Sequence, residues 1–98
     1  MAQLTHDTAT LERVDFLLRY LFSEWTDVAS LADEWDQLDM TQKEDFHHEW
    51  VGSTEMLLRK VDDLYQRGCM TSHQQQSYDQ LIELVNMRRP LVARLLQS

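Results

Sequence analysis

Glu44 and His47 are the residues of this chain whose spacing is most typical of metal chemistry. Positions i and i+3 share one face of a helix, and carboxylate-bridged di-iron bundles use Glu-x-x-His pairs of this kind to direct ligands inward. Such sites contain two pairs and two further glutamates, whereas this chain has one pair, so a complete site would need a homodimer. The competing interpretation, a helix-capping box of Thr41 and Glu44, is favoured because so short a motif often matches by chance. We therefore expect no cofactor and keep Glu44 and His47 as the candidate ligands of an alternative function.

A concentration of acidic residues gives a second chemical signal. The segment from Glu24 to Glu49 holds nine acids and a single base, Lys43. Four of these acids fall near the expected end of the first helix: Asp33, Glu34, Asp36 and Asp39. Negative charge at a helix C-terminus is unfavourable by about 0.3–1 kcal/mol per residue, so helix stability does not explain Asp36 and Asp39. A basic protein partner would explain them, as would an ordinary solvated surface, and we predict these four acids as partner-binding residues.

Several large apolar residues fall outside the faces that we expect to be buried. They are Phe16, Tyr20, Met56, Met87 and Leu91. Methionine is common at adaptable binding surfaces, and five such residues on a small protein favour association. We predict Phe16 and Met87 as partner-binding residues and expect a homodimer. Arg88, Arg89 and Arg94 make the other end of the sequence basic, so self-association through complementary charge is a further possibility.

Signals for enzyme chemistry are weaker. The acidic segments 12–15 and 33–36 superficially resemble the paired motifs of all-α nucleotide pyrophosphohydrolases, in which carboxylates hold Mg²⁺ between helices. Their spacing departs from the glutamate-rich pattern of that family, and both fall on one expected helix, so solvated helix faces are the favoured interpretation. Cys69 has no nucleophile signature beside it, and the sequence has no Gly-rich phosphate loop or G-x-S-x-G elbow. We expect no enzyme activity.

A long amphipathic helix must carry most of these residues. Apolar residues recur at alternating intervals of three and four, which keeps them on one side of a helix: Leu11, Val14, Leu18, Leu21, Trp25, Val28, Ala32 and Trp35. A second column of Leu17, Leu31 and Leu38 widens this face and favours more than one neighbouring helix. We predict a helix over 8–38, capped by Asp7 or Thr8, with a kink at Thr26 as an alternative.

Two further helices follow from similar patterns. We predict one over 42–67, starting at the Thr41/Glu44 box and ending before Gly68, which can adopt a left-handed conformation. Its expected inner positions are Phe46, Trp50, Leu57, Val61 and Leu64, flanked by Val51, Leu58 and Tyr65. Small residues at 52–54 indicate either a close helix approach or a break, and we favour the close approach. The last helix, over 73–97, starts at a Ser72/Gln75 box and has a kink or break near Pro90. Its inner face is expected to carry Tyr78, Leu81, Ile82, Val85, Val92, Leu95 and Leu96.

Together these elements predict an all-α fold, an antiparallel three-helix bundle with long helices that completes its core as a dimer. We expect residues 1–7 to form a flexible N-terminal segment and residues 8–98 to form a single domain. A chain of 98 residues with 43% hydrophobic residues can build one core. Its formal net charge of −8 disfavours nucleic acid as a partner.

The remaining sequence features concern location and role. No apolar run approaches the ~18 residues of a membrane span, and no signal peptide is recognised, so we expect no membrane partner. A single cysteine, Cys69, allows no internal disulfide and indicates a cytoplasmic location. We predict a non-enzymatic protein-interaction module: a small adaptor, a chaperone-like subunit, or an acidic inhibitor or immunity-type protein that covers a basic surface. The alternative is a metal-binding helical protein that uses Glu44 and His47 across a dimer interface.

Overall fold

The computed structural model describes residues 8–97, and every regular element within that range is helical. The elements in chain order are α1 (Thr8–Glu34), η2 (Trp35–Gln37), α2 (Met40–Glu49), η3 (Trp50–Thr54), α3 (Glu55–Gln66) and α4 (Ser72–Gln97). The predicted all-α class is therefore confirmed. The segment 1–7, including the candidate cap Asp7, lies outside the described residues. None of the helices in the described range is long and apolar enough to cross a membrane.

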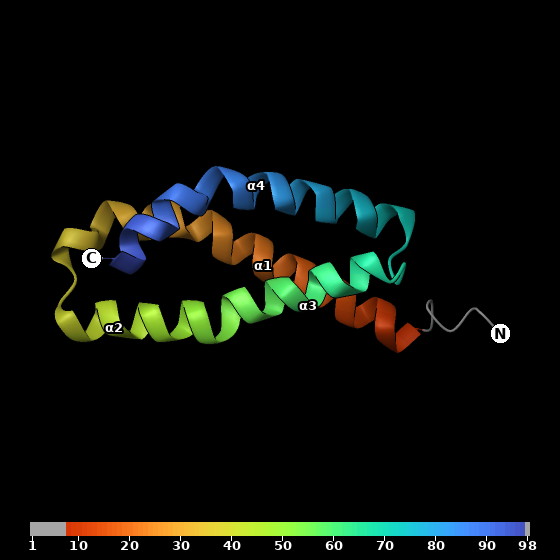
Figure 1. The fold of residues 1–98 in the computed structure, drawn as a ribbon, viewed down its shortest axis with the longest axis horizontal. Helices are drawn as coiled ribbons and strands as arrows, with labels where there is room; N and C mark the ends of the chain where they lie inside the picture. The colour runs from red at the N-terminus through yellow and green to blue at the C-terminus, as the bar shows by residue number, and fades with distance from the viewer. Residues whose placement is uncertain (1–7, 98) are drawn as a thin grey trace.

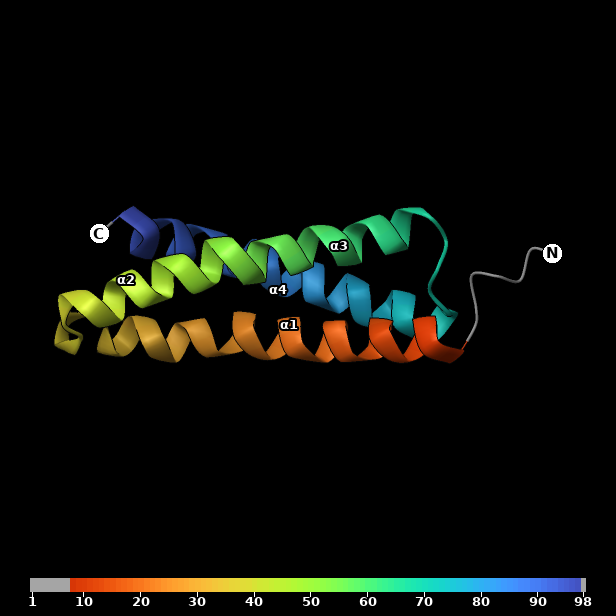
Figure 2. The ribbon, with the colours of Figure 1, turned by 90° about the horizontal axis from the view of Figure 1, so that it is seen from below.

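Three rods lie side by side along the long axis of a molecule that measures 53 × 21 × 17 Å (Figures 1 and 2). The first rod is α1, the second is formed by α2, η3 and α3, and the third is α4. The chain reverses direction after α1 and again after α3, so α1 and α4 run the same way (Figure 1). Because α1 packs closely along α4 and also contacts α3, it presents separate flanks to the two other rods.

The core follows the predicted apolar stripe of α1. Val14, Leu21 and Trp25 are fully buried there, and Val61 and Leu81 are fully buried on the two facing rods. Two polar side chains, Thr54 and Gln74, are buried with them. The α1 helix is continuous through Thr26, and no new helix starts at that residue.

Helix starts differ from the predicted ones by one or two residues. The second rod starts at a capping box of Asp39 and Gln42, not Thr41 and Glu44. The third starts at a box in which Thr71 and Gln74 exchange hydrogen bonds, not Ser72 and Gln75. The first rod correspondingly ends at Glu34, and the chain is extended at Leu38.

The end of α3 follows the prediction. Gly68 has a φ of +74°, the left-handed conformation that favours glycine. Its N–H donates to the carbonyl of Tyr65, and the N–H of Cys69 donates to the carbonyl of Leu64. These two bonds form a Schellman motif, which ends the helix.

The second rod widens between α2 and α3. In η3 the helix is a π-helix, and the N–H of Glu55 donates to the carbonyl of Trp50, five residues earlier. Buried positions in this region are spaced by four residues, from Trp50 to Thr54 to Leu58. The predicted inner position Leu57 is therefore only half-buried, and Leu58 occupies the core.

The small residues of η3 do not mark a close helix approach. A Cβ atom added to Gly52 would meet no atom within 4 Å, so the expected close packing at this glycine is wrong. Val51, expected to flank the buried face, is 56% exposed. The buried small residue is Thr54, because the wider turn of η3 directs it to the core.

The last helix continues through Pro90, so of the two expected alternatives, a kink or a break, the break is wrong. Pro90 is exposed, and water can bond the carbonyl group that loses its intrahelical donor there. The C-terminal part of α4 bends relative to its first part (Figure 1).

Candidate partner-binding site

The predicted partner-binding acids surround the turn between α1 and α2. Asp33 and Glu34 end α1, Asp36 lies in η2, and Asp39 immediately precedes α2. All four residues are exposed. We call these four residues the acidic turn. Lys43, the base nearest to it in sequence, lies over the Trp35 ring at 5.5 Å from its centroid.

Asp39 has a structural role that the sequence analysis placed elsewhere. Its carboxylate accepts a hydrogen bond of 2.8 Å from the backbone N–H of Gln42, and the Gln42 side chain accepts one from the backbone N–H of Asp39. This charge lies at the N-terminus of α2, where the helix dipole favours it. The expectation that Asp39 opposes the dipole at a helix C-terminus is therefore wrong, and local stability accounts for this acid.

A groove with one sign of charge lies between α1 and α2 and encloses about 340 Å³. Glu24 and Asp27 of α1 form one wall, and Asp45 and Glu49 of α2 form the other. The floor consists of apolar and aromatic side chains: Val28, Leu31, Phe46 and Trp50. Gln42 completes the lining, in which none of the residues is basic. We call this feature the acidic groove.

The walls of the acidic groove repel each other. Burial raises the pKa of Glu24 above its ordinary value, and the negative charges of Glu49 and Asp27 raise this pKa further. The pKa of Tyr20 is raised by burial and then by Glu24 and Glu49. Neither ion pair found within residues 8–97 uses a groove carboxylate, and Asp27 accepts a hydrogen bond of 3.4 Å from the Ser23 hydroxyl.

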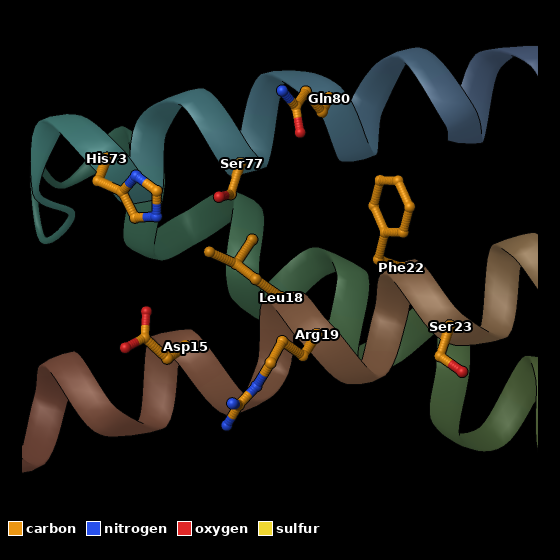
Figure 3. A pocket seen from close by; sticks show the side chains of 8 residues that line it. All are labelled: Asp15, Leu18, Arg19, Phe22, Ser23, His73, Ser77 and Gln80. Atoms are coloured by element: carbon orange, nitrogen blue, oxygen red, sulfur yellow. The ribbon is translucent and has the colours of Figure 1, made fainter.

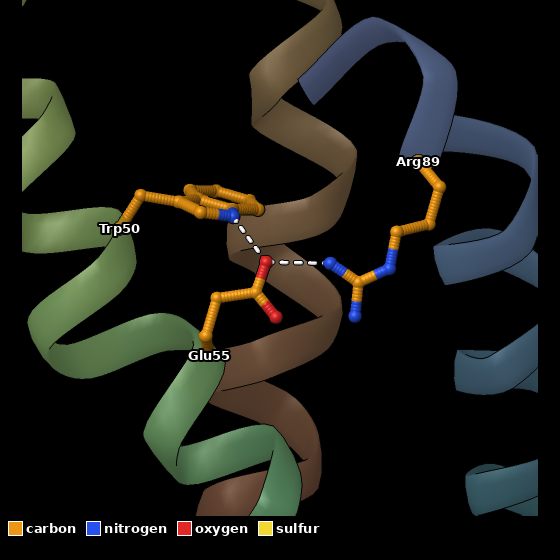
Figure 4. Close-up of polar contacts among 3 residues, drawn as sticks. All are labelled: Trp50, Glu55 and Arg89. Atoms are coloured by element: carbon orange, nitrogen blue, oxygen red, sulfur yellow. Dashed lines mark hydrogen bonds and ion pairs between the residues drawn. The ribbon is translucent and has the colours of Figure 1, made fainter. Parts of the chain in front are cut away.

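The aromatic floor contacts α1 directly and is linked to α4 through Glu55. Trp50 packs edge-on against Trp25 of α1, with ring centroids 4.7 Å apart, and stacks on Phe46 at 5.4 Å. Its indole N–H donates to Glu55 Oε2 at 2.9 Å, and Arg89 of α4 donates to the same oxygen at 2.5 Å (Figure 4). Because η3 displaces Glu55 by part of a turn, this carboxylate can bridge Trp50 and Arg89.

A larger groove of about 560 Å³ lies between α1 and α4 (Figure 3). It is lined by residues of mixed character: Asp15, Leu18, Arg19, Phe22, Ser23, His73, Ser77 and Gln80. Asp15 already accepts a hydrogen bond of 2.8 Å from the side chain of Gln74. Because both signs of charge occur here, this groove does not select a ligand by charge.

The other predicted site residues lie outside both grooves. Phe16 is 59% exposed and stacks on Tyr20, and Met87 on α4 is 67% exposed. Glu44 is exposed, and the His47 ring meets the Phe46 ring edge-on. The part of the chain that the structure describes holds no group of three or more His, Cys, Asp or Glu side chains placed to bind a metal. A site shared between two copies stays a prediction.

The four groove acids belong to the nine acids between Glu24 and Glu49, but they are not among the predicted partner-binding residues. Glu24 and Asp27 are three residues apart and lie on either side of Leu31 on the helix surface. Asp45 and Glu49 are four residues apart. Each spacing places a pair on one helix face. That these faces oppose each other depends on the rotation of α2 about its axis, which the apolar pattern alone does not specify.

Comparisons of this chain with protein-family models, with curated proteins and with solved structures find no match.

Proposed function

We propose that this chain is an antiparallel three-helix bundle that acts as a non-enzymatic interaction module and binds a basic surface of a protein partner. The observation that carries the proposal is the acidic groove, with carboxylates on both walls and no base in its lining. Three exposed acids at the neighbouring turn, Asp33, Glu34 and Asp36, extend the negative surface. This arrangement favours an acidic inhibitor or immunity-type role over an adaptor that binds through apolar faces.

Folding gives no reason for this placement of charge. Carboxylates that face each other across a groove destabilise the folded chain, and burial of Glu24 adds to the cost. Elsewhere the chain provides a partner for a part-buried carboxylate, since Arg89 pairs with Glu55. A cationic group from a partner would offset the repulsion in the acidic groove and would be attracted from a distance by the net charge of −8.

The homodimer and the cytoplasmic location belong to this proposal as well. Six large apolar residues are exposed among the described residues, including Phe16 and Met87, and a second copy is one means of covering them. Light scattering at several concentrations would then give about twice the chain mass of 11.7 kDa. A monomer at every concentration would exclude both the dimer and a Glu44/His47 site shared across it. The single thiol, Cys69, supports a reducing compartment.

The central experiment compares two triple variants that change the charge by the same amount. One is Glu24→Gln with Asp45→Asn and Glu49→Gln in the acidic groove, and the other is Asp33→Asn with Glu34→Gln and Asp36→Asn at the turn. A partner is first identified by co-purification with the wild-type protein, and its affinity for both variants is then measured by titration calorimetry.

We expect the groove variant to lose more affinity than the turn variant, because its charges lie beside apolar and aromatic side chains, where a charge pair is less screened than at an open turn. The turn variant should chiefly slow association and reduce its dependence on salt. Unchanged affinity and association rate in both variants would overturn the proposal. If only Phe16→Ala or Met87→Ala weakens binding and both charge variants bind normally, the partner-binding site would lie at these exposed apolar residues instead.

A further inference from the structure

We infer that the acidic groove recognises an arginine side chain of the partner in preference to lysine. This inference rests on the proposed function and names the group that enters the groove. The reason is the combination of carboxylates on two walls with the aromatic floor of Phe46 and Trp50. A site that selected positive charge alone would need the carboxylates and not the rings.

The geometry of the groove suits a planar cation. Glu24 and Asp27 on one helix face Asp45 and Glu49 on the other, so a guanidinium fork between the helices can donate to both walls. Phe46 is half-buried and Trp50 is 3% exposed. The Phe46 ring is therefore the aromatic surface that a ligand would contact, and Trp50 packs against it from the core side. A guanidinium group is weakly hydrated and stacks on aromatic rings, whereas a lysine ammonium group loses more hydration on entering such a site.

The chain itself contains the same arrangement next to the groove. The Arg89 guanidinium carbon lies 4.9 Å from the centroid of the Trp25 ring, and the same group donates to Glu55. An indole face and a carboxylate thus hold one arginine within the protein (Figure 4 shows its contact with Glu55). The acidic groove repeats this pair of elements, aromatic ring and carboxylate, with no basic residue of the chain in its lining.

The experiment uses two labelled probe peptides of equal length, one with alternating glycine and arginine and one with alternating glycine and lysine. Their affinities for the full chain are measured by fluorescence anisotropy at low ionic strength, where electrostatic binding is strongest. Nitrogen–proton correlation NMR then locates the site through the indole signal of Trp50. The groove triple variant removes three of the four groove carboxylates and leaves Asp27, and Phe46→Leu removes the ring while it keeps an apolar side chain at that position.

We expect the arginine peptide to bind at least about fivefold more tightly than the lysine peptide, within the range of cation–π contacts. Phe46→Leu should bring the affinity of the arginine peptide close to that of the lysine peptide, with little change for the lysine peptide. The groove variant should weaken the binding of both peptides. Equal affinities that are both lost in the groove variant would overturn the arginine preference and leave the proposed function standing. If both peptides bind the groove variant as tightly as the wild type, or if neither peptide binds at all, both the arginine preference and the proposed function would be overturned.

Discussion

The two capping boxes of this protein stand at opposite ends of the molecule and serve different purposes. Gln74, in the box at the start of α4, is 4% exposed and also donates to the carbonyl of Leu11 and to Asp15. Its side chain therefore joins α4 to α1. The box of Asp39 and Gln42 at the start of α2 is exposed, and Gln42 lines the acidic groove. The box at the start of α4 links α4 to α1 by hydrogen bonds, and the box at the start of α2 only caps its own helix.

This contrast extends to the residues around each box. At the end where α4 begins, Tyr78 donates to Asp62 and stacks on Tyr65, so polar groups find partners within the chain. At the end where α2 begins, the helix has no buried residue between Met40 and Glu49, and its acids face α1 or solvent. Polar groups at the first end bond across the rods, whereas the capping box at the second end bonds only within its own turn and leaves the groove carboxylates without an ion pair among the described residues.

The largest expected effect tests where the stability resides. Leu81→Ala should lower the free energy of unfolding by about 2–5 kcal/mol, because Leu81 is fully buried among the three rods. Leu31→Ala at the acidic end should cost less, because Leu31 is half-buried and its removal leaves a space open to the groove. Urea denaturation measures both values. A larger loss for Leu31→Ala would place the stable part of the molecule at the acidic end and reverse the comparison.

The two boxes themselves provide the second test. Gln74→Ala should cost about 1–3 kcal/mol, because Gln74 is buried and its hydrogen bonds to the Leu11 carbonyl and the Asp15 carboxylate are lost. Gln42→Ala should cost less than about 1 kcal/mol, because water can replace an exposed cap. Both values can be obtained from thermal or urea denaturation of the two matched variants. If the two substitutions cost the same, the box at α4 does not join α4 to α1 as described.

The sequence predicted the fold class and most of the core but not the positions of these boxes. The spacing of Val14, Leu18, Leu21 and Trp25 is regular, so the buried face of α1 could be derived from helix geometry alone. At the start of α2, two overlapping boxes satisfy the same residue preferences. The extended backbone at Leu38 and Asp39 decides between them, and residue preferences alone do not specify it.

The candidate site was less predictable for a related reason. In the π-helical turn the Glu55 N–H donates to the carbonyl of Trp50, and the residue types of η3 gave no signal for this wider turn. It changes which residues of the second rod are buried, as Leu57 and Leu58 show. The acidic groove further depends on how α2 rotates against α1. Sequence reasoning could therefore find an excess of acid in this region without finding the walls of the groove.

The two glycines give a third test, with effects of opposite sign. Gly68→Ala should destabilise the protein by about 1–2 kcal/mol, because an L side chain is strained at a φ of +74°. Gly52→Ala should raise stability by about 0.5–1 kcal/mol, because the added methyl group meets no atom and restricts the unfolded chain. Thermal denaturation distinguishes the two signs. A loss of stability in Gly52→Ala would show that η3 needs glycine for its wider turn.

The smallest expected effect is the most specific to the acidic groove, since it concerns the single charge of Glu24. Its folded-state pKa is raised by burial and then by Glu49 and Asp27, so the folded protein holds this proton more tightly than the unfolded chain does. The ionised carboxylate therefore reduces stability above the folded-state pKa, and the penalty disappears as the pH falls below the ordinary glutamate pKa of about 4.3. Glu24→Gln should be more stable than the wild type at neutral pH, and the difference should shrink as the pH falls through that window. Paired urea denaturations of Glu24→Gln and the wild type across the pH range measure it. A constant difference, or a wild type that is the more stable of the two at neutral pH, would mean that the groove walls do not repel, and the main reason to expect a cation there would be removed.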